Sequence, residues 1–201
     1  LQTKTVGGAG KSWAEQLDES AKGIEERLPA LYDMEAVLIK YPVKFEESMN
    51  TVLTMELAKF NRLLSVVKKS LAEVQRALVG DTVMSTDLET MGTSIVNGQV
   101  PDMWGKYAYP SLKPLSSWVS DLLDRLNFFE LWIQNDLPPV VWITGFFFTP
   151  CFLTGTRQNY ARKHKIPIDE LDFDFELFHP DKGHAIKERA PDGCYINGAF
   201  L

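Results

Sequence analysis

The feature that most constrains the fold of this chain is a long apolar stripe with the spacing of one helix face. Between residues 46 and 78, apolar side chains recur in alternating steps of four and three, which keeps them on one side of an α-helix. The stripe consists of Leu53, Leu57, Phe60, Leu64, Val67, Leu71, Val74 and Leu78. At about 1.5 Å per residue the helix would be roughly 50 Å long, with Gly80 as its stop signal. Such a stripe is either buried core or an interface for another helix.

Two shorter helices are predicted before the long one. Ser12 and Glu15 have the spacing of a capping box, in which each side chain bonds the other residue's backbone N–H. Apolar residues at helical spacing follow: Trp13, Leu17, Ala21, Ile24 and Leu28. Pro29 ends this helix, and a second short helix is expected from residue 33 to residue 41.

Two further helices are predicted after the long one. Thr86 and Glu89 form a second apparent capping box, and Gly98 and Pro101 close the helix that it opens. Another amphipathic helix is expected over residues 114–134. The inward faces comprise Leu88, Met91 and Ile95 in the first helix, and Leu115, Trp118, Leu122, Leu126, Phe129 and Ile133 in the second.

The last third of the chain has β character. After the break at Leu137–Pro139, Val140–Ile143 is a short β-branched and aromatic run, typical of a buried strand. Apolar and acidic residues then alternate over Leu171–Leu177, which predicts a strand with one wet face. Residues 194–201 predict a strand that ends without its partner. The fold class is therefore α+β: an N-terminal helical part with one long helix, followed by a small, incomplete antiparallel β part.

A tight passage is predicted between the first strand and the helix after it. Gly145 breaks the strand, and a backbone with positive φ would explain a glycine there. Phe146–Phe148 follow as an apolar block, and core is favoured over a docking patch because a strand and a helix flank it. Thr149 is expected to cap the helix, with Pro150 at its first position. The tryptophans expected to pack between helices and β layer are Trp104, Trp118, Trp132 and Trp142.

Composition narrows the possible classes of function. The net charge of −6 argues against a nucleic-acid or acidic-membrane partner. No apolar run reaches the roughly 18–20 residues that a membrane helix needs. Two cysteines, Cys151 and Cys194, are too few for a disulfide framework and fit a reducing compartment. The first residue is Leu1, which together with the unpartnered last strand suggests a piece of a longer polypeptide.

One motif suggests phosphate binding. Gly10, Lys11 and Ser12 match the end of a P-loop, whose backbone N–H groups and lysine hold phosphates. The pattern requires a glycine at position 5, where this chain has Thr5, and no buried strand precedes the loop. A flexible linker ending in a helix cap is therefore favoured. These residues remain a weak cofactor-binding candidate, and no catalytic or metal site is predicted.

Other chemistry-bearing residues have simpler interpretations. The histidines lack the cysteine or glutamate spacing of a zinc site and are expected to be solvated. Ser65 and Lys68 lie mid-helix, with Lys68 expected to point to water. The remaining groups are three histidines (His164, His179, His184), three acids expected on a wet strand face (Asp169, Asp172, Asp174) and four bases expected at a solvated helix end (Arg157, Arg162, Lys163, Lys165).

Five separated segments, in the same order, give this sequence a resemblance to the C-terminal domain of dynein heavy chains. They are Lys40–Leu53, Val100–Trp104, Tyr109–Leu115, Trp142–Lys163 and Ile166–Asp169. A glycine-rich Gly-Lys-Ser loop also occurs at this place in the family, outside its ATP sites. The sequences Gly-Phe-Phe-Phe and Phe-Leu-Thr-Gly resemble axonemal heavy chains more than cytoplasmic ones. Among axonemal heavy chains, the resemblance is to the single-headed inner-arm type.

The resemblance implies a domain without catalytic residues of its own. It implies residues 1–40 at the junction with the preceding AAA module, 41–136 as the helical part, and 137–201 as a mixed part that begins a β-barrel. The intact motor would hydrolyse ATP with magnesium in a ring of AAA modules and walk on microtubules. This domain would pack on those modules and modulate force and run length.

The resemblance also implies a place and partners. Microtubules and dynein intermediate and light chains would be met only through the intact complex, in the cytoskeleton of a ciliary or flagellar axoneme. No nucleic acid or membrane would be involved. Two alternatives stay open: a small P-loop nucleotide-binding protein using Gly10, Lys11 and Ser12, and a helical adaptor that pairs through the Leu53–Leu78 stripe.

Overall fold

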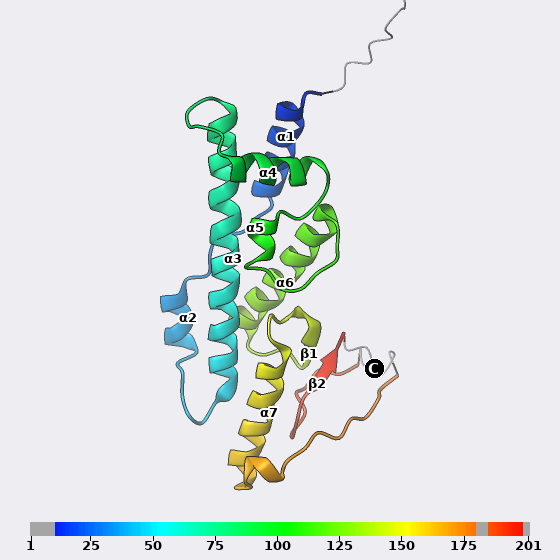
Figure 1. The fold of residues 1–201 in the computed structure, drawn as a ribbon. Coiled ribbons are helices and arrows are strands. Elements are labelled where there is room, and N and C mark those ends of the chain that lie inside the picture. The colour runs from blue at the N-terminus through cyan, green and yellow to red at the C-terminus, as the bar shows by residue number, and fades with distance from the viewer. Residues whose placement is uncertain (1–10, 180–184, 199–201) are drawn as a thin grey trace, which may run out of the picture. The chain divides into compact units, whose positions relative to one another are not determined.

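The computed structural model describes residues 11–179 and 185–198 (Figure 1). Its helices are α1 (Trp13–Glu25), α2 (Met34–Lys40), α3 (Ser48–Leu78), α4 (Thr86–Val96), α5 (Asp102–Gly105), α6 (Leu115–Asn135) and α7 (Thr149–His164). Two 3₁₀ turns, η1 (Ile143–Gly145) and η2 (Ile168–Glu170), and two strands, β1 (Val140–Trp142) and β2 (Tyr195–Asn197), complete the described elements. The α+β class is confirmed. No helix in the described part is long and apolar enough to span a bilayer.

The chain divides into two compact units. The first contains Leu1–Pro29 and Leu64–Ser120, and the second contains Ala30–Leu63 and Asp121–Leu201. Helices α3 and α6 contribute residues to both units because two of the divisions fall inside them. The expected division at residues 40 and 136 stays a prediction.

The long helix is confirmed, and its stripe is core. The side chains of Leu53, Leu57, Phe60, Leu64, Val67, Leu71 and Val74 are fully buried. Gly80 ends the helix with a φ of 84°, and the Asp81 N–H bonds the Arg76 carbonyl at 2.9 Å. This is the left-handed C-terminal cap for which glycine carries no steric cost.

In the first unit, α1 packs closely against α4. The capping box of Ser12 and Glu15 is present at the start of α1. A Cβ at Gly92 would lie 2.6 Å from Leu17 Cδ2, so a side chain there would obstruct the contact. The second predicted capping box is wrong: Ser85 caps α4 through the Leu88 N–H, and Thr86 is already the first helical residue. The extended backbone of Ser85, with a ψ of 159°, places its hydroxyl over the helix end.

The first unit is further held by tryptophans. Trp104 Nε1 donates to Ser70 Oγ over 2.8 Å, and both side chains are buried. The rings of Trp104 and Trp118 are stacked with centroids 5.9 Å apart, and Tyr109 stacks on Trp118 at 6.3 Å. A buried indole N–H needs such an acceptor, which fixes Trp104 against α3.

The core of the second unit is aromatic. Phe146 lies 5.3 Å from Phe129 and 5.2 Å from Phe152, centroid to centroid, and Phe60 lies 4.6 Å from Phe147. Within the predicted apolar block, Phe146 is buried, Phe147 is half-buried, and Phe148 is 51% exposed. The core prediction therefore holds for the first part of the block only.

The entry into α7 differs from the prediction by one residue. Phe148 is the N-cap residue, Thr149 is the first helical residue, and Pro150 follows it. Thr149 Oγ1 instead donates to the Ile143 carbonyl at 3.3 Å. Gly145 is not among the residues with positive φ; a Cβ there would lie 2.8 Å from Trp142 Cε3, so close packing on the indole explains the glycine.

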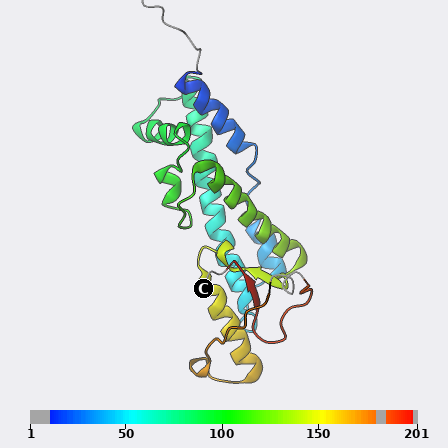
Figure 2. The same ribbon diagram turned by 90° about the vertical axis from the view of Figure 1, so that its right-hand side faces the viewer.

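The sheet has two described strands, and they are parallel, not antiparallel as predicted. Val140 pairs with Tyr195, Val141 with Ile196 and Trp142 with Asn197. Figures 1 and 2 show β2 beside β1, and because α7 and η2 lie between the two strands in the chain, their connection is a crossover. The C-terminal strand therefore has a partner after all. The strand predicted over Leu171–Leu177 is wrong: that segment has no ladder partner among the described residues, and Phe175 and Leu177 are exposed.

Candidate functional site

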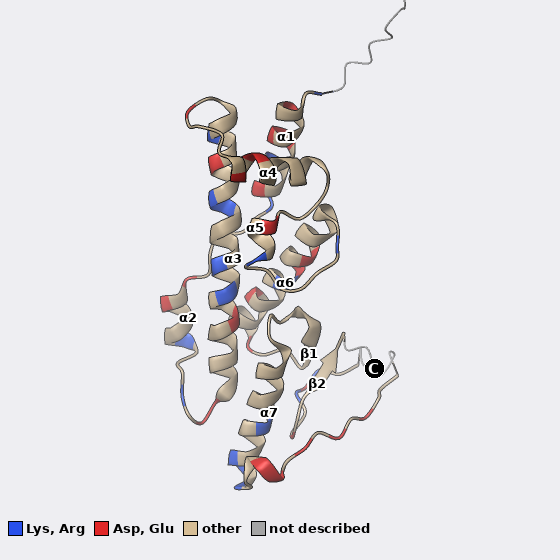
Figure 3. Cartoon of the chain, in the orientation of Figure 1, with Lys and Arg blue, Asp and Glu red and all other residues tan. Residues whose placement is uncertain are grey.

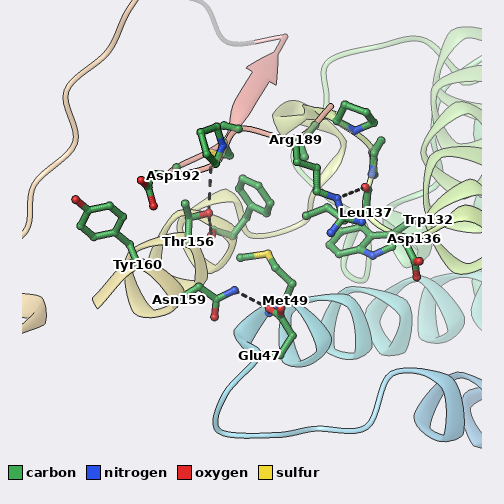
Figure 4. Close-up of a pocket in the computed structure, with 18 of the residues that line it drawn as sticks. Glu47, Met49, Trp132, Asp136, Leu137, Thr156, Asn159, Tyr160, Arg189 and Asp192 are labelled. Atoms are coloured by element: carbon green, nitrogen blue, oxygen red, sulfur yellow. Dashed lines mark hydrogen bonds between the residues drawn. The ribbon is translucent and has the colours of Figure 1, made fainter. Parts of the chain in front are cut away.

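The second unit contains a cavity of about 380 Å³, which is the candidate site (Figure 4). Its walls come from the end of α6 and the loop after it, from the start of α3, from α7, and from residues 189–194. The residues that define its chemistry are Tyr41, Glu47, Asp136, Thr156, Asn159, Lys163, Arg189, Asp192 and Cys194. The fold brings these groups together from segments that are far apart in the sequence.

One wall is built on the C-terminal end of α6. The Tyr41 hydroxyl donates to Asp136 Oδ1 at 2.7 Å and lies 2.9 Å from the Trp132 carbonyl. Lys40 Nζ donates to the carbonyl of Gln134 at 3.2 Å. Burial first, and then the Asp136 carboxylate, raise the pKa of Tyr41 to about 12. The phenol is therefore protonated at neutral pH and serves as a cap for helix carbonyls that have no partner inside the helix.

The floor of the cavity joins α3 to α7. Glu47 Oε1 accepts from Asn159 Nδ2 at 2.6 Å and from the Met49 N–H at 2.9 Å, as Figure 4 shows for the Asn159 bond. Gly155 allows close contact, because a Cβ there would lie 2.8 Å from Met49 Cε. These carboxylate and amide groups are thus engaged in holding the two helices together.

Residues 189–193, which we call the strap, close the remaining side. Asp192 Oδ1 lies 2.8 Å from both Lys163 Nζ and His164 Nε2, and Lys163 Nζ also donates to the Pro191 carbonyl at 2.7 Å. Arg189 Nε donates to the Leu137 carbonyl over 2.8 Å. The hydrogen bond to His164 first, and then that to Lys163, lower the pKa of Asp192. The strap is therefore tied at both ends by charge-assisted bonds.

A buried acid near this site was not predicted from the sequence. Glu56 on α3 is 1% exposed, and its carboxylate accepts the N–H groups of Phe147 and Phe148 at 2.6 and 3.1 Å. Burial raises the pKa of Glu56, against the lowering effects of those hydrogen bonds and of Lys59 and Arg125. Glu56 is one of the few buried polar residues of α3, and only the fold shows what it contacts.

The polar groups that line the cavity are engaged with other parts of the second unit. The cavity's described carboxylates, amide and lysine are each bonded to backbone or to one another. Thr156 Oγ1 faces Cys194 Sγ at 4.0 Å, and burial raises the pKa of the Cys194 thiol, which disfavours the nucleophilic thiolate. No group of three or more histidine, cysteine or acidic side chains that could hold a metal ion occurs among the described residues.

The phosphate-binding candidates are engaged elsewhere. Lys11 Nζ pairs with Glu19 on the surface of α1, and Ser12 caps the same helix. Gly10 lies outside the described residues. Neither Lys11 nor Ser12 lines the cavity in the second unit.

Several other predicted positions are now located. His164 pairs with Asp192, His179 is exposed, and His184 lies outside the described residues. Asp169, Asp172 and Asp174 are exposed, as predicted, although on coil and 3₁₀ structure. Lys68 is half-buried, with Nζ 3.5 Å from the Leu28 carbonyl, so the prediction that it points to water is wrong. Cys151 and Cys194 are both free thiols.

The basic residues at the end of α7 are solvated only in part: Lys163 and Lys165 are exposed, whereas Arg157 and Arg162 are half-buried. Arg157 donates to the carbonyls of Ile168 and Leu171 at 2.9 and 2.6 Å, and Arg162 bonds Ser48 Oγ. Lys163 holds the strap. Only Lys165, at the left-handed end of the helix with a φ of 56°, is exposed without such a contact among the described residues. The other basic groups donate hydrogen bonds to carbonyls, a hydroxyl and a carboxylate of other segments.

Comparison with known proteins places this architecture in a family. The family model for the C-terminal domain of dynein heavy chains matches residues 1–201. This protein belongs to that family.

Its relatives include three axonemal heavy chains. The chain is 49% identical over 201 residues to dynein axonemal heavy chain 1 of Rattus norvegicus, with all of this chain and 4% of the relative covered. It is 50% identical over 196 residues to dynein axonemal heavy chain 3 of Homo sapiens, covering 97% and 5%. It is 45% identical over 194 residues to dynein axonemal heavy chain 12 of Homo sapiens, covering 96% and 6%. The chain thus spans about a twentieth of the length of these relatives.

Proposed function

We propose that this protein is a non-catalytic domain of an axonemal dynein heavy chain, and that it packs on the AAA ring of that same motor. From there it modulates an ATP-driven microtubule motor of cilia or flagella, of the single-headed inner-arm type. ATP and magnesium bind in the ring, and microtubules and intermediate and light chains are met through the intact complex. The observation that carries this proposal is the family match over residues 1–201.

The described side chains support a bracing role. The cavity's polar groups are committed to holding helix ends and the strap, which rigidifies the unit instead of presenting reactive groups. Apolar side chains nevertheless remain exposed, among them Ile39, Phe45 and Val83. Exposed apolar surface of this kind favours a domain that is covered by another part of its protein.

The two alternatives are less well supported. A P-loop would need Lys11 to reach a phosphate, whereas it pairs with Glu19. A helical adaptor would need the Leu53–Leu78 stripe for a second helix, but the stripe is already buried from Leu53 to Val74. A partner could use it only if the fold opened.

Two measurements test the proposal. We expect fluorescent ATP to show no saturable binding to this protein up to millimolar concentration, with or without Lys11→Ala. Magnesium-dependent binding that is lost in Lys11→Ala would instead favour the P-loop. In a heavy-chain motor, we expect deletion of this domain to leave nucleotide turnover present and to change microtubule gliding velocity or stall force. A motor with an intact ring and no turnover after deletion would contradict the non-catalytic role.

A further inference from the structure

A second hollow of the second unit lies between the connection from α2 to α3 and the last turns of α7. This groove has a volume of about 470 Å³ and is lined on one side by Val43, Lys44 and Phe45, and on the other by Ala161, Arg162 and Ile168. It is separate from the cavity described above, since the two share no lining residue.

The rim of this groove carries unusually exposed apolar side chains. Phe45 is 79% exposed and Val43 is 58% exposed. Single exposed apolar residues are ordinary, but two that border one open groove form a contiguous surface that water solvates poorly. The groove is therefore suited to receive an apolar side chain.

The charged side chains that line this groove, Lys44 and Arg162, are both basic. The Arg162 guanidinium stacks over the Phe45 ring, 4.9 Å from the centroid, and donates to Ser48 Oγ. Arg162 Nε is buried without a hydrogen-bond partner. No described carboxylate forms an ion pair with Arg162 or Lys44, whereas Lys163 on the same helix turn has Asp192. Figure 3 shows the basic residues at this end of α7.

We propose that this groove is a docking site for a segment of the rest of the heavy chain that presents an apolar side chain beside a carboxylate. The apolar side chain fills the space between Val43, Phe45 and Ile168, and the carboxylate pairs with Lys44 and Arg162. Charge complementarity selects the acidic partner, because a basic one would face two uncompensated cations. The inference rests on the proposed function, and the occupant comes from the roughly nineteen-twentieths of the relatives' length that this domain does not cover.

Site-specific photocross-linking in an intact heavy-chain motor tests the site. Benzoylphenylalanine replaces Phe45, and in a matched control it replaces Val83, which is 88% exposed in the first unit. We expect the probe at position 45 to cross-link to a residue outside positions 1–201 that has an aspartate or glutamate within a few residues. Cross-links from position 83 alone would overturn the proposal that the groove is a docking site, but not the proposal that the domain packs on the ring. No cross-link from either position, with the domain free of the ring, would overturn both.

Charge reversal tests the partner's chemistry. Lys44→Glu alters an exposed residue of the groove and should lower the yield of the cross-link from position 45 by about tenfold. Lys187→Glu reverses an exposed lysine elsewhere in the second unit and should leave the yield unchanged. Arg162→Lys should retain most of the cross-link and Arg162→Glu should lose it, with circular dichroism confirming that both fold. Equal yields in Lys44→Glu and Lys187→Glu would overturn the acidic partner.

Discussion

The carboxylate of Glu56, in the middle of α3, accepts the backbone N–H of Phe147 at 2.6 Å. With the Phe148 N–H at 3.1 Å, this acid satisfies the donors that precede α7, where no side chain of the helix itself serves as a cap. A residue of α3, far away in the sequence, thus caps the start of α7.

Glu56→Leu should destabilise the second unit because two part-buried N–H groups lose their acceptor. The expected cost is about 2–4 kcal/mol, since each unsatisfied buried donor costs about 1–3 kcal/mol. Glu56→Gln keeps one acceptor oxygen and should lose less. Urea denaturation followed by circular dichroism measures both. A Leu variant as stable as the wild type would show that water replaces the carboxylate.

Glu56 should also make stability depend on pH. Because burial raises the pKa of Glu56 in the folded state, the folded protein binds the proton more tightly than the unfolded chain. The stabilisation that results from this pKa shift is fully present below the ordinary pKa of a glutamate. It is lost as the pH rises through the raised pKa of Glu56 in the folded protein. The difference in unfolding free energy between wild type and Glu56→Gln should therefore change across this interval and be constant above it. Other carboxyls cancel in this comparison.

Gly92→Ala should destabilise the first unit. The new methyl group would lie 2.6 Å from Leu17 Cδ2 and 2.9 Å from Trp13 Cζ2, so these side chains or the two helices must shift. We expect a loss of about 1–3 kcal/mol from overpacking, reduced by up to about 1 kcal/mol of gained helix propensity. Gly23→Ala is the matched control, because nothing lies within 4 Å of its Cβ; it should raise the melting temperature. Equal shifts in both variants would contradict the close contact.

Leu64→Ala should cost about 2–5 kcal/mol, because the side chain of Leu64 is fully buried and its removal leaves a cavity. Met55→Ala in the same helix removes a side chain that is 47% exposed and should cost much less. Thermal denaturation compares the two. Equal melting temperatures for the Leu64 and Met55 variants would mean that the stripe is not part of the core in solution.

Asp192→Asn should loosen the strap. It removes the charge that both Lys163 and His164 contact, and Cys194 follows two residues later. With Cys151→Ser as background, the rate of Cys194 labelling by a thiol reagent should rise. Lys187→Glu serves as the control for a charge change in the same region. Unchanged labelling in Asp192→Asn would show that the hydrogen bond from Arg189 to Leu137 is sufficient.

The local signals in the sequence predicted the helices well. The capping box at Ser12, the stripe on α3 and the glycine stops at Gly80 and Gly98 each depend on neighbours within one or two turns, and each is present. The N-caps of α4 and α7 were displaced by one residue, because adjacent Ser85 and Thr86, or Phe148 and Thr149, differ only in backbone angles. The cofactor-binding candidates Lys11 and Ser12 do not line the cavity, so they did not help to locate it.

The elements that can be predicted from the amino-acid sequence are those whose stabilising contacts are close along the backbone: the helices, the buried stripe and the break before β1. Tertiary structure decided the partners of those elements. The alternation over Leu171–Leu177 predicted a strand, but this segment pairs with no other strand among the described residues. Tyr195–Asn197 instead pairs in parallel with Val140–Trp142. Side-chain periodicity records which face is apolar, but strand pairing and the capping of Phe147 by Glu56 depend on groups far apart in the sequence that only the fold brings within bonding distance.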